Sequence, residues 1–289
     1  MINYHFHDHR SADGSEPLPR HCEAAVTCGV SAICVTNHAE TLAPDGSWVA
    51  ELDEMRERFL GVRESVLDAR EHFPGLSIRL GIELEYRAEW TDTFDRLTEE
   101  IPFDFVLGSV HMVDGLNISG GPHRNRFFEG RSQHEAYDRY FRELDAMIEW
   151  GGFDVVSHFD LIARYGHTHY GSYDPARYRD VIQPVLEAMA SRGLGIEINT
   201  SGVFGPGVPY PERDILVWAR EAGVPALTLG TDSHRPDTFA DGLVEGVMLG
   251  RSAGWGELTL YEERRAAKTV PMERAVAWAE GRPTSRAQA

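Results

Sequence analysis

Seven apolar, β-branched-rich runs recur along the chain, and a helix-like segment follows each of the first six. The runs cover residues 2–7, 32–38, 77–86, 103–112, 153–159, 194–199 and 226–232. The helix-like segments cover residues 17–29, 49–72, 89–100, 132–150, 175–192 and 211–222. Strands that alternate with helices at this spacing are typical of a parallel α/β architecture. The chain is therefore expected to form a parallel sheet whose strands are joined by helices.

No change in composition marks a linker, so we expect residues 1–289 to form one domain. After the seventh run, a short strand at 258–261 and a helix at 272–280 are expected. Residues 263–289 are accordingly interpreted as a C-terminal helical extension with a frayed tail. Two long connections, 41–48 and 113–131, are rich in Gly, Pro, Asn and aromatic residues, and such loops commonly build or cover an active site.

Each apolar run closes on a His, Asp, Glu or Asn at or near its carboxyl end. In the first run, His5 and His7 alternate along an extended backbone and therefore point to the same side. In a parallel barrel the carboxyl ends of the strands meet on one face, where catalytic residues sit. The candidate metal ligands on that face are His5, His7, Asp13, His38, Glu83, His111, His158, Asp232 and His234. So many N and O ligands without cysteine suit two or three Zn, Fe or Mn ions that share a bridging carboxylate.

A cluster of divalent ions favours the hydrolysis of a phosphate ester. The ions lower the pKa of a bridging water and neutralise charge that develops on the phosphoryl group. The planar guanidinium of arginine suits the remaining phosphate oxygens. Arg164, shortly after His158, and Arg235, next to His234, are therefore candidate substrate-binding residues.

Composition restricts the possible partners. The formal net charge of −18 argues against binding to nucleic acid or to an anionic membrane surface. The sequence contains no apolar run of membrane-spanning length and no signal-peptide pattern, so we expect a cytoplasmic protein. The three cysteines, Cys22, Cys28 and Cys34, lie in one short segment and do not suggest a disulfide framework.

The order of the short motifs resembles that of a known family. H-x-H followed by an acidic residue, then T-x-H, G-x-E, G-S-V-H, S-H-x-D and T-D-S-H, resembles the PHP (polymerase and histidinol phosphatase) superfamily between Tyr4 and about Thr238. Segments 104–111, 157–165 and 197–202 further resemble the stand-alone histidinol-phosphate phosphatases, which remove phosphate from L-histidinol phosphate in histidine biosynthesis. The resemblance implies a distorted (β/α)7 barrel with a trinuclear metal site at the carboxyl ends of the strands.

The resemblance also assigns the ligands to three ions. The first would take His5, His7, Glu83 and Asp232; the second, Glu83, His111 and His158; the third, Asp13, His38 and His234. His9 has no counterpart and is expected not to bind metal. The implied mechanism is direct attack by a metal-bridging hydroxide, with Asp232 or His234 able to protonate the departing alkoxide. Glu197 and Asn199 are candidates for binding a cationic, histidinol-like substrate.

Two other enzyme readings remain open at this point. A PHP-type phosphoesterase could act on nucleotides or short oligonucleotides, although the chain lacks a basic stripe. An amidohydrolase-type barrel also begins with H-x-H, but that group often places a carboxylated lysine between its metals. Lys268 is the only lysine and lies outside the seven runs. The expected partner is a small phosphomonoester, and the expected state is a monomer or small homo-oligomer.

Overall fold

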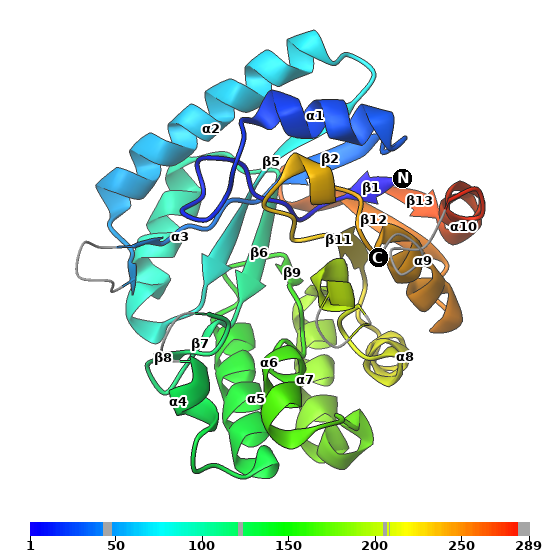
Figure 1. The fold of residues 1–289 in the computed structure, drawn as a ribbon. Helices are drawn as coiled ribbons and strands as arrows, with labels where there is room; N and C mark the ends of the chain where they lie inside the picture. Colours follow the sequence, from blue (N-terminus) through cyan, green and yellow to red (C-terminus); the bar gives the residue numbers. More distant parts are fainter. Residues whose placement is uncertain (43–47, 121–123, 205–206, 208, 283–289) are drawn as a thin grey trace.

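Seven parallel strands form the centre of the protein (Figure 1). The computed structural model describes residues 1–42, 48–120, 124–204, 207 and 209–282. In spatial order the strands are β1 (Ile2–Asn3), β2 (Ala32–Val35), β5 (Ser77–Glu85), β6 (Phe105–Ser109), β9 (Val155–Val156), β10 (Gly195–Asn199) and β11 (Leu227–Gly230). The spatial order follows the order along the chain, as successive right-handed crossovers require.

Backbone hydrogen bonds near the first and last strands join the two edges of the sheet and close it into a barrel. The amide of Tyr4 donates to the carbonyl of Leu229 at 2.9 Å, and the amide of His7 donates to the carbonyl of Ser233 at 2.8 Å. The barrel is distorted because β1 and β9 contribute only two ladder residues each. The distorted seven-stranded α/β barrel expected from the sequence is confirmed.

The six expected crossover helices are present and surround the barrel (Figure 1). They are α1 (Leu18–Thr27), α2 (Leu52–His72), α3 (Thr91–Glu100), α5 (Gln133–Trp150), α7 (Arg179–Arg192) and α8 (Arg213–Ala222). Capping residues mark both ends of α5. Ser132 and Glu135 form a capping box, and Gly151 ends the helix in the left-handed conformation.

Three further helices were not predicted: α4 (Arg124–Phe128), α6 (Ile162–Tyr170) and α9 (Leu243–Ser252). The sequence of α9 contains Gly246 and Gly250, which count against a helix on propensity alone. Tertiary packing explains Gly246, because a Cβ at this position would lie 2.6 Å from Cδ1 of Leu229 in the barrel wall. Its missing side chain allows α9 to approach the strands closely.

Two short antiparallel hairpins lie in the long connections. Strands β3 (Thr41–Leu42) and β4 (Trp48–Val49) pair in the first, and β7 (Met112–Val113) and β8 (Leu116–Asn117) pair in the second. Helix α4 follows β8 and packs against α6, so the segment predicted as a long loop is partly ordered into secondary structure. Residues 43–47 and 121–123 of these predicted loops lie outside the described part of the chain.

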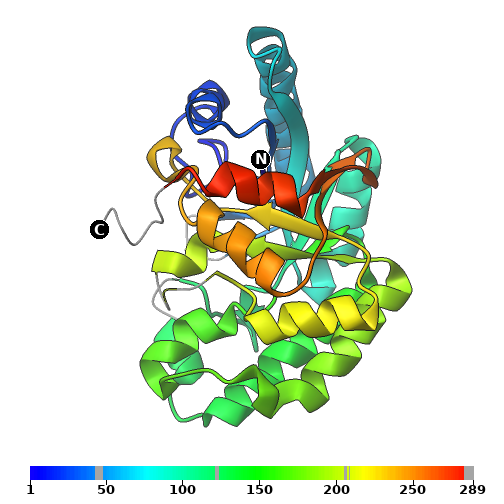
Figure 2. The ribbon, with the colours of Figure 1, turned by 90° about the vertical axis from the view of Figure 1, so that its right-hand side faces the viewer.

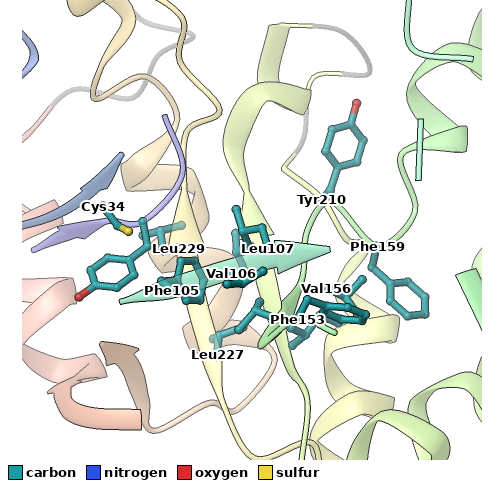
Figure 3. Close-up of a cluster of buried hydrophobic side chains, with 14 of the residues drawn as sticks. Cys34, Phe105, Val106, Leu107, Phe153, Val156, Phe159, Tyr210, Leu227 and Leu229 are labelled. Atoms are coloured by element: carbon teal, nitrogen blue, oxygen red, sulfur yellow. The ribbon is translucent and has the colours of Figure 1, made fainter. Parts of the chain in front are cut away.

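The strands are buried on both faces. Every residue of β2, β6 and β10 is buried, as expected for a parallel sheet covered by helices. Figure 3 shows part of the resulting core, with Phe105, Val106, Leu107, Leu227 and Leu229 gathered around the strands. Polar side chains therefore concentrate at and beyond the carboxyl ends of the strands.

A hairpin of β12 (Glu257–Glu262) and β13 (Arg265–Pro271) packs at the amino-terminal end of the barrel. The ring of Tyr261 lies 5.0 Å from that of Phe105, and the Tyr4 hydroxyl donates to the Tyr261 carbonyl. Arg264 in the turn pairs with Asp154, which directly precedes β9. Strand β13 corrects the prediction of a helical extension from residue 263, because the extension becomes helical only at α10 (Met272–Ala279).

Helix α10 lies beside α9 on the outside of the barrel (Figure 2). The predicted frayed tail falls largely on residues 283–289, which are outside the described residues. Among the helices of the described part of the chain, none is both long and apolar enough to cross a membrane.

Replacing Tyr261 with Ala tests whether the C-terminal hairpin belongs to the cooperative fold. The side chain is 5% exposed, so its loss should lower the free energy of unfolding by about 3 kcal/mol in urea titrations. Lys268→Ala on the exposed face of β13 is the control and should change it by less than about 0.5 kcal/mol. Equal stabilities of the two variants would show that the hairpin unfolds separately from the barrel.

Candidate metal centre at the carboxyl ends of the strands

The side chain of Glu83 lies at the centre of the converging polar groups. It projects from β5, and only 1% of its surface is exposed. Its Oε2 lies 3.3 Å from His5 Nε2, 3.5 Å from His7 Nε2 and 3.0 Å from His38 Nδ1. Three imidazole nitrogens, from the ends of two strands, thus face one oxygen of this carboxylate.

The other oxygen of Glu83 faces a second set of ligands. Its Oε1 lies 3.2 Å from His158 Nε2 and 3.7 Å from His111 Nε2, and it accepts a hydrogen bond from Ser109 Oγ. The two ring nitrogens, His111 Nε2 and His158 Nε2, are 3.1 Å apart. Because its two oxygens face different imidazoles, Glu83 has the geometry of a bridging carboxylate.

The spacing on the Oε2 side suits a tetrahedral ion. His5 Nε2 lies 3.5 Å from Asp232 Oδ1, and His7 Nε2 lies 3.2 Å from the same oxygen. Together with the distances from His5 and His7 to Glu83 Oε2, these separations fall between 3.2 and 3.5 Å. Tetrahedral zinc with bonds of about 2.0 Å places its ligand atoms about 3.3 Å apart. His5, His7 and Asp232 thus form one ligand cluster, and Glu83 Oε2 lies within 3.5 Å of both of its imidazoles.

A third group lies on the more open side. Asp13 Oδ2 is 3.1 Å from His234 Nε2 and 3.7 Å from His38 Nε2, and ligand atoms of His7 lie within the same cluster. The side chain of Asp13 is 51% exposed, whereas that of Glu83 is nearly fully buried. His38 faces Glu83 with one nitrogen and Asp13 with the other, so it lies between two groups rather than in the third alone.

Several buried polar atoms in these groups have no hydrogen-bond partner. They are His5 Nε2, His38 Nδ1, Glu83 Oε2 and His234 Nε2. Buried polar atoms are nearly always paired, and a cluster of unpaired donors and acceptors at ligand spacing is what a metal site requires. The residues present therefore fit divalent ions.

Neighbouring imidazoles keep the two central carboxylates ionised. Burial alone would raise the pKa of Glu83, but His5 and His38 lower it well below its usual range. Asp232 behaves in the same way, because His5 and the hydrogen bond from His7 outweigh its burial and depress its pKa. Burial, with His234 and His38 nearby, lowers the pKa of His7 to about 3, which keeps this imidazole in the neutral, metal-binding form.

Three of the candidate imidazoles are oriented through their Nδ1 atoms. His5 Nδ1 lies 2.8 Å from Glu197 Oε1, His111 Nδ1 lies 2.7 Å from Glu85 Oε2, and His234 Nδ1 lies 2.9 Å from the Asp232 carbonyl. A ring that donates from Nδ1 presents Nε2 as its ligand atom. These contacts therefore point the Nε2 atoms of the rings into the centre.

Two buried acidic residues beside the centre were missed in the sequence. Glu85 and Glu40 are 2% and 4% exposed, and they form a further cluster with His111. Burial raises the pKa of Glu40 to about 7. For Glu85 a signal existed, because it stands two positions after Glu83 in the same strand and therefore projects to the same side.

The backbone is strained at two of the ligand positions. His158 has a φ of 22° and Asp232 a φ of 54°, values that non-glycine residues seldom adopt. Such outliers persist where the surrounding structure imposes them, and they occur often at functional sites. At both positions the turn directs a ligand side chain over the end of the barrel.

The candidate substrate residues fall into different environments. Arg164, in the first turn of α6, donates from NH1 to Ser201 Oγ at 3.2 Å, and that hydroxyl lies 3.4 Å from Asp232 Oδ2. This places Arg164 beside the metal groups. Arg235 is 65% exposed and pairs with Asp237 on the surface. The surroundings of Arg164, but not those of Arg235, favour contact with a bound phosphate.

Glu197 and Asn199 are buried and occupied by protein contacts. Glu197 accepts hydrogen bonds from the His158 amide and from Asn199 Nδ2, in addition to its contact with His5. Asn199 Oδ1 accepts from the amide and hydroxyl of Ser201. These contacts favour a role in orienting the site over the predicted contact with substrate. His9 is 46% exposed and belongs to none of the ligand clusters among the described residues.

Substituting Glu83 with Gln tests the bridging role. Adding Zn²⁺ or Mn²⁺ to the metal-free wild-type protein should raise its melting temperature, because an ion at 100 times its Kd stabilises the fold by about 2.7 kcal/mol. Glu83→Gln should lose most of this rise, measured by thermal unfolding with and without metal. Glu100→Gln, which removes a surface ion pair with Arg56, is the control and should keep it. A full rise in the Glu83 variant would contradict the bridging role.

Comparison with known proteins identifies the family of the chain. Residues 3–201 match the model of the family described as the PHP domain. A histidinol-phosphatase of Lactococcus lactis is 28% identical over 269 residues, which cover 92% of this chain and 96% of that relative. A probable histidinol-phosphatase of Deinococcus radiodurans is 26% identical over 92% of this chain and 98% of its own length.

A solved structure is similar over nearly its whole length. The Lactococcus lactis histidinol phosphate phosphatase, complexed with zinc, L-histidinol and phosphate, superposes with a TM-score of 0.80 at 26% identity. The match covers 92% of this chain and 98% of that one. A putative histidinol phosphatase of Listeria monocytogenes has the same fold, with a TM-score of 0.70 at 19% identity. The resemblance inferred from the motifs is confirmed, and the chain belongs to the PHP domain family.

Proposed function

We propose that this protein is a metal-dependent phosphomonoesterase that hydrolyses L-histidinol phosphate to L-histidinol and phosphate. The observation that carries the proposal is the convergence of imidazoles and Asp232 on both oxygens of Glu83, with Arg164 beside them. The relatives named histidinol-phosphatase, one of them solved with zinc, L-histidinol and phosphate, support the choice of substrate.

We assign the candidate ligands to three ions. One ion would be held by the cluster of His5, His7 and Asp232 together with Oε2 of Glu83. A second would be held by Oε1 of Glu83 with His111 and His158. The more exposed group of Asp13, His234, His38 and His7 would hold a third. When bound, such ions lower the pKa of a coordinated water and neutralise negative charge on the phosphoryl group.

The chain's own residues would bind the substrate. Arg164 would donate to a phosphate oxygen. Its guanidinium donates to Ser201 Oγ, which lies 3.4 Å from Asp232 Oδ2. Asp232 directs Oδ1 at His5 and His7, and its Oδ2 accepts a hydrogen bond from the Ser201 hydroxyl. Because the depressed pKa of Asp232 keeps its carboxylate ionised and His234 Nε2 would bind metal, we assign both residues to the ligand set and not to protonating the departing oxygen.

A panel of phosphomonoesters tests the proposed substrate. With the metal content of the same sample measured, kcat/KM for histidinol phosphate should exceed that for nucleoside monophosphates and p-nitrophenyl phosphate by about 100-fold, because the site must bind more than the phosphate. Equal values across the panel would refute the assignment to histidinol phosphate and leave a general phosphatase. No phosphate release from any ester by metal-loaded protein would refute the phosphatase itself.

Replacing Arg164 with Gln tests its contact with phosphate. A hydrogen bond to a charged group contributes about 1.5–3 kcal/mol, so kcat/KM for histidinol phosphate should fall by about 10- to 150-fold. Arg142→Gln removes an exposed arginine that pairs with Asp138, and it should leave kcat/KM unchanged. If the Arg164 variant matches this control while its metal content is normal, Arg164 does not bind the substrate.

A further inference from the structure

Two buried carboxylates stand behind the centre, one on each side of Glu83. Glu197 contacts the Nδ1 atom of His5, and Glu85 contacts the Nδ1 atom of His111. His5 Nε2 then faces Glu83 Oε2 at 3.3 Å, whereas His111 Nε2 faces Glu83 Oε1 at 3.7 Å. The two carboxylate–imidazole pairs thus approach opposite oxygens of the bridging group.

The contacts of Glu197 fix its position. Its side chain is 1% exposed. Its Oε1 meets His5 Nδ1 at 2.8 Å, and its Oε2 accepts from the His158 amide at 3.0 Å and from Asn199 Nδ2 at 3.1 Å. With only donors around it, this carboxylate has no remaining oxygen for a substrate.

The neighbouring strand makes room for the pair of Glu197 and His5. A Cβ at Gly230 in β11 would lie 2.2 Å from the His5 Cβ and 2.5 Å from Glu197 Oε1. Both distances are far below normal contact, so any larger residue at this position would displace the pair. The glycine in the seventh strand is therefore explained by the approach of these two side chains.

Glu85 holds His111 in a comparable way. Its side chain is 3% exposed, and Oε2 lies 2.7 Å from His111 Nδ1. The amides of His111 and Met112 donate to Oε1 at 3.2 and 3.1 Å. The carboxylate thus fixes both the backbone turn and the ring of the same ligand residue.

We propose that Glu197 and Glu85 are positioning residues, each of which sets the affinity of one ion. Glu197 acts through His5 on the ion at the Oε2 side of Glu83, and Glu85 acts through His111 on the ion at the Oε1 side. A carboxylate at Nδ1 fixes the tautomer and orientation of the ring and makes Nε2 a stronger donor to metal. This inference rests on the metal centre of the proposed function and is independent of the identity of the substrate.

Variants with glutamine separate the two roles. Glu197→Gln and Glu85→Gln keep the size of the side chain, but each places an amide NH2 group against backbone or side-chain donors and removes the charge. Metal-free protein is dialysed against buffered free zinc, bound zinc is measured, and anomalous maps from crystals at intermediate zinc show which position is filled. Glu197→Gln should need about 10- to 100-fold more free zinc to fill the Oε2-side position only, and Glu85→Gln the Oε1-side position only.

Asp154→Asn is the matched control. Asp154 is also a buried carboxylate that accepts from a backbone amide and pairs with a cation, but it lies at the opposite end of the barrel. It should bind zinc as the wild type does. If a glutamine variant does not fold, Glu197→Asp or Glu85→Asp replaces it. The shorter side chain keeps the charge but withdraws the oxygen from Nδ1, so it should lower the zinc affinity of the same position.

The outcomes separate the two proposals. Wild-type affinity at both positions in the variants that fold, or weakening of the same position by both substitutions, would overturn the inference. A wild-type protein that binds no divalent ion would instead overturn the metal centre on which the proposed function depends.

Discussion

The site depends on the carboxylate of Glu83, which is buried among imidazoles. Glu83 is held inside the barrel with imidazoles at both oxygens, and its Oε2 lacks a hydrogen-bond partner. A charged carboxylate in such a place is costly unless cations or donors surround it. Neutral imidazoles can donate only from their protonated nitrogen, and Nδ1 of His5 and of His111 already faces another carboxylate. Metal ions would resolve this conflict because both carboxylates and imidazole nitrogens would then act as ligands.

The barrel separates the stable part of the molecule from the chemically active part. At the amino-terminal end, aromatic rings such as Tyr261 and Phe105 pack together, and Arg264 and Asp154 form an ion pair. At the carboxyl end, the described residues include unpaired polar atoms and ligand positions with positive φ. Packing at the amino-terminal end stabilises the fold and offsets the free-energy cost of the strained, unpaired groups at the carboxyl end.

The strand ends could be predicted from the sequence because two simple patterns agree there. Apolar runs locate buried strands, and a polar residue at the end of each run marks the common face. Helix α9 could not be predicted in this way, because Gly246 is explained only by its close approach to Leu229 in the barrel wall. The C-terminal strand β13 is exposed at most positions and lacks the pattern of a buried strand.

At the site, too, the sequence could not predict contacts that arise only in the folded chain. The sequence identifies Glu197 as a polar residue at a strand end, but only the fold shows that His5, from the other end of the chain, takes one of its oxygens. His38 illustrates the same point, since its two nitrogens face different groups. Ligand type follows from residue identity, whereas the division of ligands among ions depends on distances that the sequence does not contain.

The balance of charge links the third ligand group to the substrate. Carboxylates of Glu83, Asp232, Asp13, Glu85, Glu197 and Glu40 lie in or beside the centre, a formal charge of −6 when all are ionised. Two divalent ions would leave this region with a net negative charge that repels a phosphate. Three ions would bring the net charge close to zero, and Arg164 adds a positive charge. We infer that an ion at the exposed group around Asp13 and a phosphate bound nearby strengthen one another's binding, because each removes the charge that opposes the other. By linkage the effect is reciprocal, so occupancy of this outer position would rise when substrate binds.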